Sequence, residues 1–345
     1  MSLRSGSPRA TLRDVAALAG VSIKTVSRVV NGERGVSADK LIAVQRAIDA
    51  LDYRPNHSAS SLRRADRRTS AVGAVLEDLA NPYSAEVLRA LEDSARARDV
   101  LVFAGSVDGD PERERELVRA FASRRADALV LVPVTEQQSY LEREVEVGTP
   151  VVFIDRPPTG FGADSVVTDN VEGAAHAVRH LAARGHRRIA FLGDARRLPT
   201  ARDRFTGFLQ AMASLGLRVT DDLVAHDLMT ADLTERAMDA LLAINEPPTA
   251  LFTARNDITI SAVRSLQRHG LERRTALVGF DDFPLADLVR PGVTVMAQDP
   301  TAIGRRAAEL IFARLEGDAS PPRTAVVRTR LVQRGSGEIP PPDAP

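Results

Sequence analysis

Residues 11 to 51 read TLRDVAALAGVSIKTVSRVVNGERGVSADKLIAVQRAIDAL and predict three short helices joined by tight turns. Thr11 is expected to cap the first helix together with Asp14, because this pairing satisfies backbone N–H groups that the first turn leaves free. Gly20 is expected to end the helix, since glycine adopts turn conformations at little cost. The expected buried residues of this helix are Val15, Ala16, Leu18 and Ala19.

A second helix is expected to begin after Ser22 and to end at Asn31 and Gly32, the usual residue types at the two ends of a helix. At about 100° per residue, its side chains divide into two faces. Val26, Val29 and Val30 form the apolar face, and Lys24, Ser27, Arg28 and Asn31 form the polar face opposite. The helix can therefore pack on one side and enter a groove with the other.

A third helix is expected to open at Ser37 and to bury Leu41, Val44, Ile48 and Leu51 at helical spacing before Tyr53 and Pro55 end it. Its role would be to hold the second helix rigidly. Three helices of this kind over residues 11–55 are the plan of a helix-turn-helix DNA-binding domain.

These residues closely resemble the lactose-repressor and galactose-repressor (LacI/GalR) family of transcriptional regulators. The shared pattern is T-L-x-D-V-A-x-x-A-G-V-S-x-x-T-V-S-R-V-x-N-G, followed by V-S and by L-x-Y-R-P-N. The resemblance implies base contacts in the major groove by Ile23, Lys24 and Arg28, chemistry that suits thymine methyl and guanine edges. It implies phosphate contacts by Thr11, Ser22, Thr25, Ser27, Asn31, Ser37 and Asn56. The alternative is an ordinary solvated helix face.

The same family places a hinge after this domain, here residues 56–69, which becomes helical only on the operator. Leu62 stands where the family drives a leucine between base pairs in the minor groove, bending the duplex. The serine-rich run has poor helix propensity, so we expect disorder in the absence of DNA. Ser60 replaces the usual arginine, which removes one expected contact, and a plain interdomain linker is the alternative.

Charge and composition agree with a DNA-binding head on a different kind of body. Residues 1–68, including an arm over 1–10 that we expect to be disordered, hold 13 Lys and Arg against six Asp and Glu, whereas the remainder holds 33 against 40. A basic segment is expected where a protein meets a polyanion. The chain has no cysteine, its six histidines lack ligand spacing, and it shows neither a membrane span nor a signal-peptide core. We therefore expect a cytoplasmic protein without metal, cofactor or membrane partner.

From residue 70 the chain alternates short apolar runs with longer amphipathic segments, which is typical of parallel sheets covered by helices. We predict an α/β body over residues 70–335, too long for one sheet, with a break at 167–170 between two similar lobes. Ligands of such folds bind beyond the carboxyl ends of the strands. The expected strands are 71–76, 100–103, 128–132, 151–154, 189–192, 250–253 and 277–280.

The body resembles the effector domain of the same family, which is similar to a periplasmic sugar-binding protein with a cleft between its lobes. The matching stretches include Asn81-Pro82-Tyr83, Gly185-His186-Arg187 and Val278-Gly279-Phe280-Asp281-Asp282. The resemblance implies lobes of 70–167 with 297–325 and of 168–296 with 326–335. It also implies effector contacts, and the alternatives are turn capping, helix capping or an ion pair that closes a lobe. The residues concerned are Asp155, Arg156, Arg204, Asn256 and Asp281.

Departures from the family pattern bear on the ligand. Ser84 and Leu228 stand where aromatic residues are common, which disfavours a purine or an ordinary hexose, because aromatic faces stack on such rings. Glu77 and Arg255 are also unusual at their positions. If Glu77, Arg156, Arg204 and Arg255 all face the cleft, we expect a strongly polar or ionised effector.

Enzyme functions are not indicated, since the sequence lacks a phosphate-binding glycine loop, a nucleophile elbow and a Cys-His or metal cluster. The adjacent pairs Asp221-Asp222 and Asp281-Asp282 are more typical of turns than of acid–base catalysis. We therefore predict an effector-controlled regulator, acting as a repressor on a pseudo-palindromic operator. Residues 336–345 are expected to form a flexible tail without leucine heptads, which favours a homodimer over a tetramer. The alternatives are a solute-binding module and an architectural DNA protein.

Overall fold

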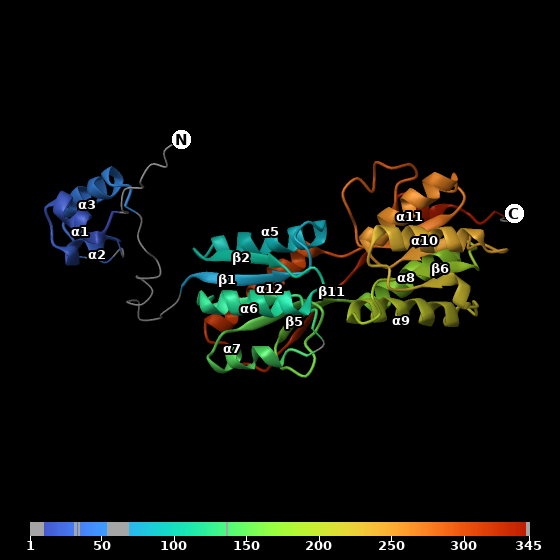
Figure 1. Ribbon diagram of the computed structural model, residues 1–345, viewed down its shortest axis with the longest axis horizontal. Helices are drawn as coiled ribbons and strands as arrows, with labels where there is room; N and C mark the ends of the chain where they lie inside the picture. The colour runs from blue at the N-terminus through green and yellow to red at the C-terminus, as the bar shows by residue number, and fades with distance from the viewer. Residues whose placement is uncertain (1–9, 31–32, 34, 54–68, 136, 343–345) are drawn as a thin grey trace. The chain divides into compact units, whose positions relative to one another are not determined.

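The computed structural model describes residues 10–30, 33, 35–53, 69–135 and 137–342 and divides the chain into two compact units, Met1–Thr69 and Ser70–Pro345. The first unit contains three helices, α1 (Leu12–Ala19), α2 (Ile23–Val30) and α3 (Ala38–Ala50). They pack together as a small bundle (Figure 1). The second unit is built from two six-stranded sheets with helices on their faces. Both parts of the predicted fold class are confirmed.

Local hydrogen bonds explain where α1 and α2 begin and end. The backbone N–H of Thr11 donates to Asp14 Oδ2 at 2.8 Å, and Thr11 Oγ1 accepts from the Asp14 N–H, which completes the expected capping box. Gly20 follows α1 with φ at 65°, the left-handed region that glycine enters without strain. Ser22 Oγ accepts from the Thr25 N–H at 3.2 Å, as expected for the cap of α2.

The core of the first unit differs from expectation at two leucines. Leu18 is 57% exposed and Leu41 is 49% exposed, so the prediction that both are buried is wrong. α3 has 13 residues whereas α1 and α2 have eight each, and all of residues 37–42 are exposed, because the two shorter helices do not cover the first turn of α3. The buried residues are Val15, Ala16, Val26, Val44, Ala47 and Tyr53.

The body contains two lobes, each with its own sheet (Figure 1). In lobe 1 the strand order is β11-β5-β4-β3-β1-β2 and all pairs are parallel. The strands are β1 (Ala71–Leu76), β2 (Leu101–Ser106), β3 (Ala128–Leu131), β4 (Val151–Asp155), β5 (Asp164–Thr168) and β11 (Thr324–Val327). The helices are α5 (Pro82–Arg96), α6 (Pro111–Ser123), α7 (Glu142–Glu146) and α12 (Pro300–Leu315), with a short 3-10 turn η1 (Ser139–Leu141).

Lobe 2 repeats this plan with the order β12-β10-β9-β8-β6-β7, in which only the β10–β12 pair is antiparallel. The strands are β6 (Ile189–Leu192), β7 (Val224–Ala225), β8 (Ala250–Thr253), β9 (Ala276–Phe280), β10 (Thr294–Ala297) and β12 (Arg330–Val332). The helices are α8 (Asn170–Ala183), α9 (Pro199–Ser214), α10 (Ala231–Ala243) and α11 (Asn256–His269), with short 3-10 turns η2 (Asp221–Leu223) and η3 (Ser336–Glu338).

The chain passes between the lobes three times. The crossings follow β5, β10 and β11, so that α12 belongs to lobe 1 although its neighbours in sequence belong to lobe 2. β11 carries lobe 1 to Val327, past the expected boundary at 325. All seven predicted strands are present, whereas β5, β7, β10, β11 and β12 were not anticipated from the apolar runs.

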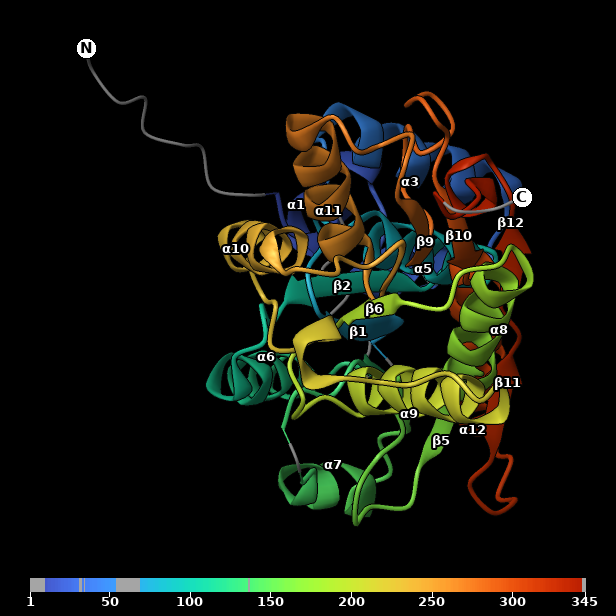
Figure 2. The ribbon, with the colours of Figure 1, turned by 90° about the vertical axis from the view of Figure 1, so that its right-hand side faces the viewer.

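One glycine in each lobe permits a close helix–helix contact. A Cβ on Gly207 of α9 would lie 2.1 Å from the carbonyl oxygen of Val171 in α8, and a Cβ on Gly304 of α12 would lie 2.4 Å from that of Val87 in α5. Figure 2 shows α9 beside α8. Only glycine fits where helix backbones approach so closely, and the contact brings Arg204 of α9 next to the start of α8.

The structure describes the chain up to residue 342 and places η3 over Ser336–Glu338, so the predicted flexible tail over 336–345 is wrong for its first part. Ser336 is buried and donates to the carbonyl of Leu277 at 2.6 Å, and Glu338 accepts from Thr294 Oγ1 at 2.7 Å. His186 bonds the carbonyl of Ile339 at 2.8 Å. Glycine and proline content suggested flexibility, but specific hydrogen bonds to β9, β10 and the start of β6 hold this segment.

In the part of the chain that the structure describes, no helix is long and apolar enough to span a membrane.

Candidate DNA-binding helix and effector cleft

α2 presents the predicted two faces. Val26 is fully buried against α1 and α3, whereas Ile23 is 45% exposed and Lys24 is exposed beside it. Thr25 and Ser27 are partly exposed. An exposed isoleucine next to a lysine, with a buried valine behind them, is a surface available for contact with base edges.

Arg28 is partly tied to its own domain. Its Nε lies 3.3 Å from a carboxylate oxygen of Glu33, and both side chains are more than one-third exposed. An exposed pair of this kind contributes little to stability, about 0–1 kcal/mol. Breaking the Arg28–Glu33 pair therefore costs little.

The predicted phosphate contacts fall into three groups. Thr11 and Ser22 cap helices, and the Thr11 hydroxyl also donates to Asp14 at 2.7 Å. Ser37 precedes α3, is exposed, and makes no capping bond with its side chain. Asn31 and Asn56 lie outside the described residues, and so does Leu62, the predicted minor-groove wedge.

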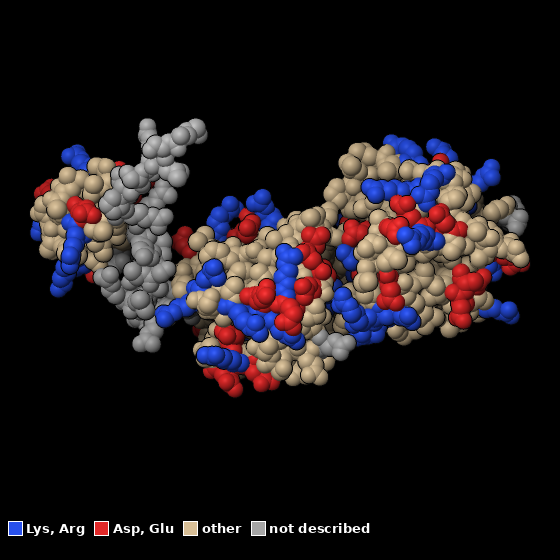
Figure 3. Space-filling model, viewed as in Figure 1, with Lys and Arg blue, Asp and Glu red and all other residues tan. Residues whose placement is uncertain are grey.

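The basic character of the first 68 residues does not come from its helices. Residues 10–30, 33 and 35–53 contain five basic and five acidic side chains, so the whole excess belongs to residues 1–9, 34 and 54–68. On the face of the body seen in Figure 3, acidic and basic side chains are interspersed. The described part of the first 68 residues is therefore neutral in sum, and the excess positive charge lies in the other segments.

The five residues predicted to contact an effector come together around one small cavity of about 60 Å³ between the lobes. They are contributed by the ends of β4 and β9, by α9, and by the start of α11. The full lining is Glu77, Asn81, Tyr83, Ser84, Val132, Asp155, Arg156, Asp194, Thr200, Arg204, Arg255, Asn256, Asp281 and Gln298.

Arg204 is the most firmly held of these side chains. Its Nε donates to Asn170 Oδ1 at 2.8 Å, and its Nη1 donates to the Ala254 carbonyl at 2.8 Å and to Asp281 at 3.3 Å. The guanidinium carbon lies 3.9 Å from the centre of the Phe280 ring. Among the described residues Nη2 has no hydrogen-bond partner, so one pair of donors remains for a ligand.

Two aspartates occupy equivalent places at the ends of β4 and β9. Asp155 has φ at 66° and Asp281 has φ at 72°, which is rare for a residue with a side chain and turns each carboxylate toward the cavity. Arg156 lies 3.3 Å from Asp155 and 2.8 Å from Glu77. Burial raises the pKa of Asp155 above its ordinary value, an effect that Arg156 and Arg204 partly offset.

The lobes are joined across the cavity by two asparagines. Asn81 Nδ2 donates to Asn256 Oδ1 at 3.1 Å, and Asn256 Nδ2 donates back to Asn81 Oδ1 at 3.0 Å. Each asparagine is also at the start of a helix, α5 in lobe 1 and α11 in lobe 2. We call these two residues the asparagine bridge. Asn256 is thus hydrogen-bonded to Asn81 of the opposite lobe. A ligand that bonds Asn256 would have to replace Asn81 or bind beside it.

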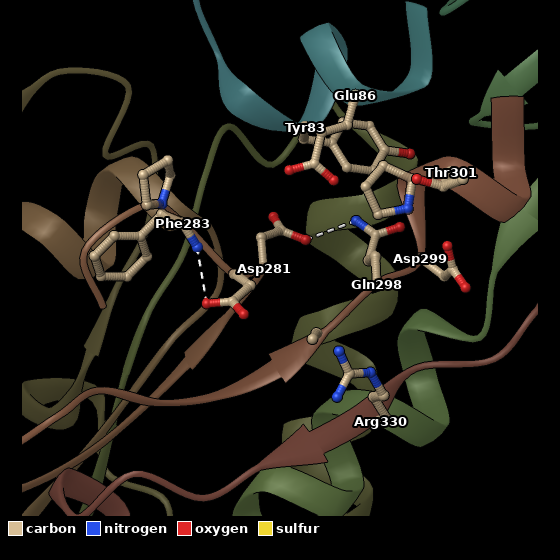
Figure 4. A pocket seen from close by; sticks show the side chains of 12 residues that line it. Tyr83, Glu86, Asp281, Phe283, Gln298, Asp299, Thr301 and Arg330 are labelled. Atoms are coloured by element: carbon tan, nitrogen blue, oxygen red, sulfur yellow. Dashed lines mark hydrogen bonds between the residues drawn. The ribbon is translucent and has the colours of Figure 1, made fainter. Parts of the chain in front are cut away.

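Sequence reasoning did not single out Asn81, Tyr83, Asp194 or Gln298. The Tyr83 hydroxyl is buried without a hydrogen-bond partner in the described chain, and burial raises the pKa of this phenol well above its ordinary value. Gln298 donates to Asp281 at 2.6 Å (Figure 4). The position of Tyr83 after Asn81-Pro82 was the available signal. Gln298 gave none, since it lies in a crossing between lobes.

A wider cavity of about 380 Å³ continues from the small one and shares Tyr83, Asp281 and Gln298 with it. Figure 4 shows Glu86 of α5, Asp299 and Arg330 around this space. Burial raises the pKa of Glu86, helped by the negative charges of Asp282 and Asp299. This end of the cleft is therefore acidic.

The residues that depart from the family pattern divide between cavity and core. Glu77, Ser84 and Arg255 line the small cavity, where Arg255 pairs with Asp194 at 3.0 Å. Leu228 is buried in the core of lobe 2 instead. All four residues on which we based the expectation of a polar or ionised ligand face the cavity. Within the described ranges, no group of side chains could hold a metal ion.

Comparison with protein families assigns both parts of the chain. Residues 11–56 match the model for bacterial regulatory proteins of the lacI family, and residues 178–337 match the periplasmic binding protein-like domain. The first match covers the three helices, and the second covers most of lobe 2.

Relatives match over nearly the whole length. The transcriptional regulator PtxS of Pseudomonas aeruginosa is 34% identical over 95% of this chain and 96% of its own. The regulator GalR of Escherichia coli is 31% identical over 96% of both chains. A structure of the transcriptional regulator CelR with cellobiose is 30% identical over 95% of this chain and 100% of its own, with a TM-score of 0.70. The Lac repressor dimer bound to operator and the anti-inducer ONPF is 25% identical over 96% and 99%, with a TM-score of 0.84.

Proposed function

The chain belongs to the LacI family of bacterial regulatory proteins, and from this premise we propose that it is a homodimeric repressor of a near-palindromic operator. A polar effector bound between its lobes either releases the repressor from the operator or holds it there. Membership makes the protein a DNA-binding transcriptional regulator and not an enzyme. A solute-binding module without DNA-dependent regulation is excluded by the family match of residues 11–56.

The exposed face of α2 supports the assignment of base contacts. Ile23 and Lys24 project from a helix whose opposite side is fixed by Val26, so that their positions are defined before DNA binds. Lys24 can donate to guanine and Ile23 can lie against a thymine methyl group. Two such helices in a dimer would read the two halves of the operator.

The small cavity is the observation that carries the effector proposal, because all five expected side chains, from both lobes, surround one space. The related CelR was solved with cellobiose, and the Lac repressor with ONPF, so ligands with several hydroxyl groups are the expected chemistry. Guanidinium and carboxylate groups suit hydroxyl groups, which both donate and accept hydrogen bonds.

Exposed apolar side chains support a dimer. β2 is an edge strand of its sheet, and its Leu101 and Phe103 are 67% and 42% exposed. Leu285 and Leu288, after β9 in lobe 2, are also exposed. Large apolar side chains on an unpaired edge strand and on an exposed loop are typical of an interface. We propose that a second copy covers them.

Effector control follows from linkage between the cleft and DNA. An effector that prefers one arrangement of the lobes changes their relative populations, and the change in DNA affinity must be matched by an equal change in effector affinity. The asparagine bridge is the contact between lobes that such a ligand would alter first, since Asn256 lines the cavity.

The test is selection of binding sites from a random DNA library with the full chain, followed by operator titrations with and without sugars, sugar acids, sugar phosphates and nucleobases. We expect a two-fold symmetric site and one class of ligand that changes operator affinity at least about fivefold. Enrichment of an asymmetric site would refute the proposal that the protein binds its operator as a dimer. Ligand binding that leaves operator affinity unchanged would refute effector control.

Leu62→Ala tests the proposed hinge in the same titrations. If Leu62 is wedged between central base pairs, its removal weakens operator binding much more than binding to unrelated DNA. Equal weakening on both DNAs would show that residues 56–69 act only as a linker.

A further inference from the structure

The cleft contains a third space, beside the small cavity and away from the acidic end. It has a volume of about 310 Å³ and lies between the loops that follow β3 and β4 in lobe 1 and the start of α9 in lobe 2. We call it the outer chamber. None of the residues expected to contact the effector lines it, and its lining is Pro133, Val134, Thr135, Gln138, Pro157, Thr159, Arg197, Leu198, Pro199 and Arg202.

The lobe 1 wall of the outer chamber is firmly built. Glu114 is completely buried and accepts hydrogen bonds from the N–H groups of Val134 and Thr135, from Thr135 Oγ1 at 2.7 Å, and from the Tyr140 hydroxyl. Gln138 then donates to the Thr135 carbonyl at 2.7 Å and accepts from the Thr159 N–H at 2.7 Å. These bonds hold both loops in place without a ligand.

The lobe 2 wall carries two positive charges that form no ion pair with the described residues. Arg197 reaches across to the Gly109 carbonyl at 3.5 Å, and Arg202 donates to the Arg197 carbonyl at 2.8 Å. Among the described residues no carboxylate oxygen lies within 4 Å of either guanidinium, whereas Arg156, Arg204 and Arg255 in the small cavity each have such a partner. The chamber therefore has a net positive lining.

The backbone adds to this charge. Pro199 is the first residue of α9, a helix of 16 residues, and no side chain of the described chain caps it. The free N–H groups and the positive end of the helix dipole thus act in the same direction as the two arginines. At the opposite end of the cleft, Asp282 is paired with Arg334, and the wider cavity presents Glu86 and Asp299 against the single arginine Arg330, so this end favours an anion less.

We propose that the outer chamber is an anion subsite and that the effector is a polyhydroxylated compound with a carboxylate or phosphate group at one end. The anionic group binds between Arg197 and Arg202, and the hydroxyl groups extend toward Asp155, Arg204 and Asp281. This inference rests on the proposed effector function and adds the charge and the orientation of the ligand. Guanidinium groups bind both anions through paired hydrogen bonds, so the chemistry is shared.

The experiment measures binding to the full chain by thermal shift and calorimetry at constant ionic strength. The probes are aldoses, the matching aldonates and the matching aldose phosphates, with sulfate as a control for any anion. We expect an aldonate or an aldose phosphate to bind, its neutral counterpart to bind at least about tenfold more weakly, and sulfate to give no comparable shift. The aldonate and phosphate arms distinguish the two anions.

Two variants assign the effect to the chamber. Arg197→Gln with Arg202→Gln is expected to weaken binding of the anionic probe about tenfold or more. The matched control is Arg196→Gln, since Arg196 is exposed like Arg197 and Arg202, pairs with Asp227 at 3.2 Å, and does not line the chamber. Each variant's thermal midpoint without ligand shows whether it is folded.

The proposal is overturned if the double variant binds the anionic probe as tightly as the unchanged chain. It is also overturned if only neutral aldoses bind or if no anionic sugar binds. Binding of neutral aldoses that changes operator affinity would leave the effector-controlled repressor standing and remove only the anion subsite.

Discussion

The polar face of α2 and the polar lining of the cleft use the same kinds of side chains in opposite ways. Lys24 and Ser27 lie at the surface, and the ion pair of Arg28 with Glu33 is exposed. Arg156 and Arg204 are buried, and each bonds with several partners from its own lobe. In the proposed function, DNA would meet groups that are hydrated, whereas a cleft ligand would meet groups that are already hydrogen-bonded.

The difference shows what each surface must do to bind. A hydrated side chain gives up water to contact DNA, so its contribution appears mainly as affinity and specificity. A buried side chain that exchanges partners changes the packing of the elements that held it. Binding in the cleft is therefore coupled to structure, and binding on α2 need not be. The predictions below test this contrast.

Arg204→Ala should have the largest effect on stability. It removes the hydrogen bonds that Asp281 Oδ2 and Asn170 Oδ1 accept from the guanidinium, and breaking a buried ion pair from one side costs about 3–5 kcal/mol. Urea unfolding followed by circular dichroism measures the decrease. The control is Arg202→Gln in the same helix, an exposed residue whose replacement should change stability by less than about 0.5 kcal/mol. Similar decreases in unfolding free energy for the two variants would contradict the proposed contrast between buried cleft residues and exposed ones.

Lys24→Ala should act on DNA affinity and leave stability unchanged. Truncating an exposed side chain that reads a base costs about 1–3 kcal/mol of binding free energy at particular base pairs. Operator variants with single base changes, titrated against both proteins, locate those pairs. If the substitution weakens all sequences alike, Lys24 contacts phosphate instead.

The asparagine bridge should contribute a smaller energy shared between the lobes. Asn81→Ala, Asn256→Ala and the double variant form a cycle, and we expect a coupling of about 1 kcal/mol because two neutral hydrogen bonds are involved. Unfolding free energies supply the four corners of the cycle. Additive effects would mean that the two amides do not stabilise each other.

Two aspartates should titrate on opposite sides of the ordinary value of 3.8. Burial raises the pKa of Asp155, whereas hydrogen bonds from Thr11 lower the pKa of exposed Asp14. As the pH falls, Asp155 takes up its proton first, above 3.8, which favours the folded state. The stability that Asp14 provides is present above 3.8 and disappears as the pH falls through its lower folded pKa.

Carboxyl NMR titrations of the unchanged chain, with Asp155→Asn and Asp14→Asn to assign the signals, test this order. A pKa for Asp155 below that of Asp14 would contradict it. The contribution of these two aspartates to the pH dependence of stability is the smallest of the expected effects, since each substitution concerns one carboxyl group.

Local sequence predicted the elements well where one short stretch carries the whole signal. The capping box of Thr11 and Asp14, the turn at Gly20 and the buried Val26 all agree with the structure. The prediction of burial was wrong at Leu18 and Leu41, because helical spacing assigns a residue to one face of a helix but does not say how far the neighbouring helix extends over that face. The prediction of a flexible tail after Gly335 was wrong for a similar reason, since the hydrogen-bond partners of this segment lie on strands distant in sequence.

The sequence by itself determined the fold class, the polar face of α2 and the residue types around the cleft, because helix periodicity, strand alternation and capping act between close neighbours in the chain. Only the tertiary structure decided that Asn81 faces Asn256, that Tyr83 and Gln298 join the cavity, and that Arg197 and Arg202 stand without carboxylate partners in the described chain. Three crossings between the lobes bring these residues together, and hydrogen bonds and charges depend on distance in space.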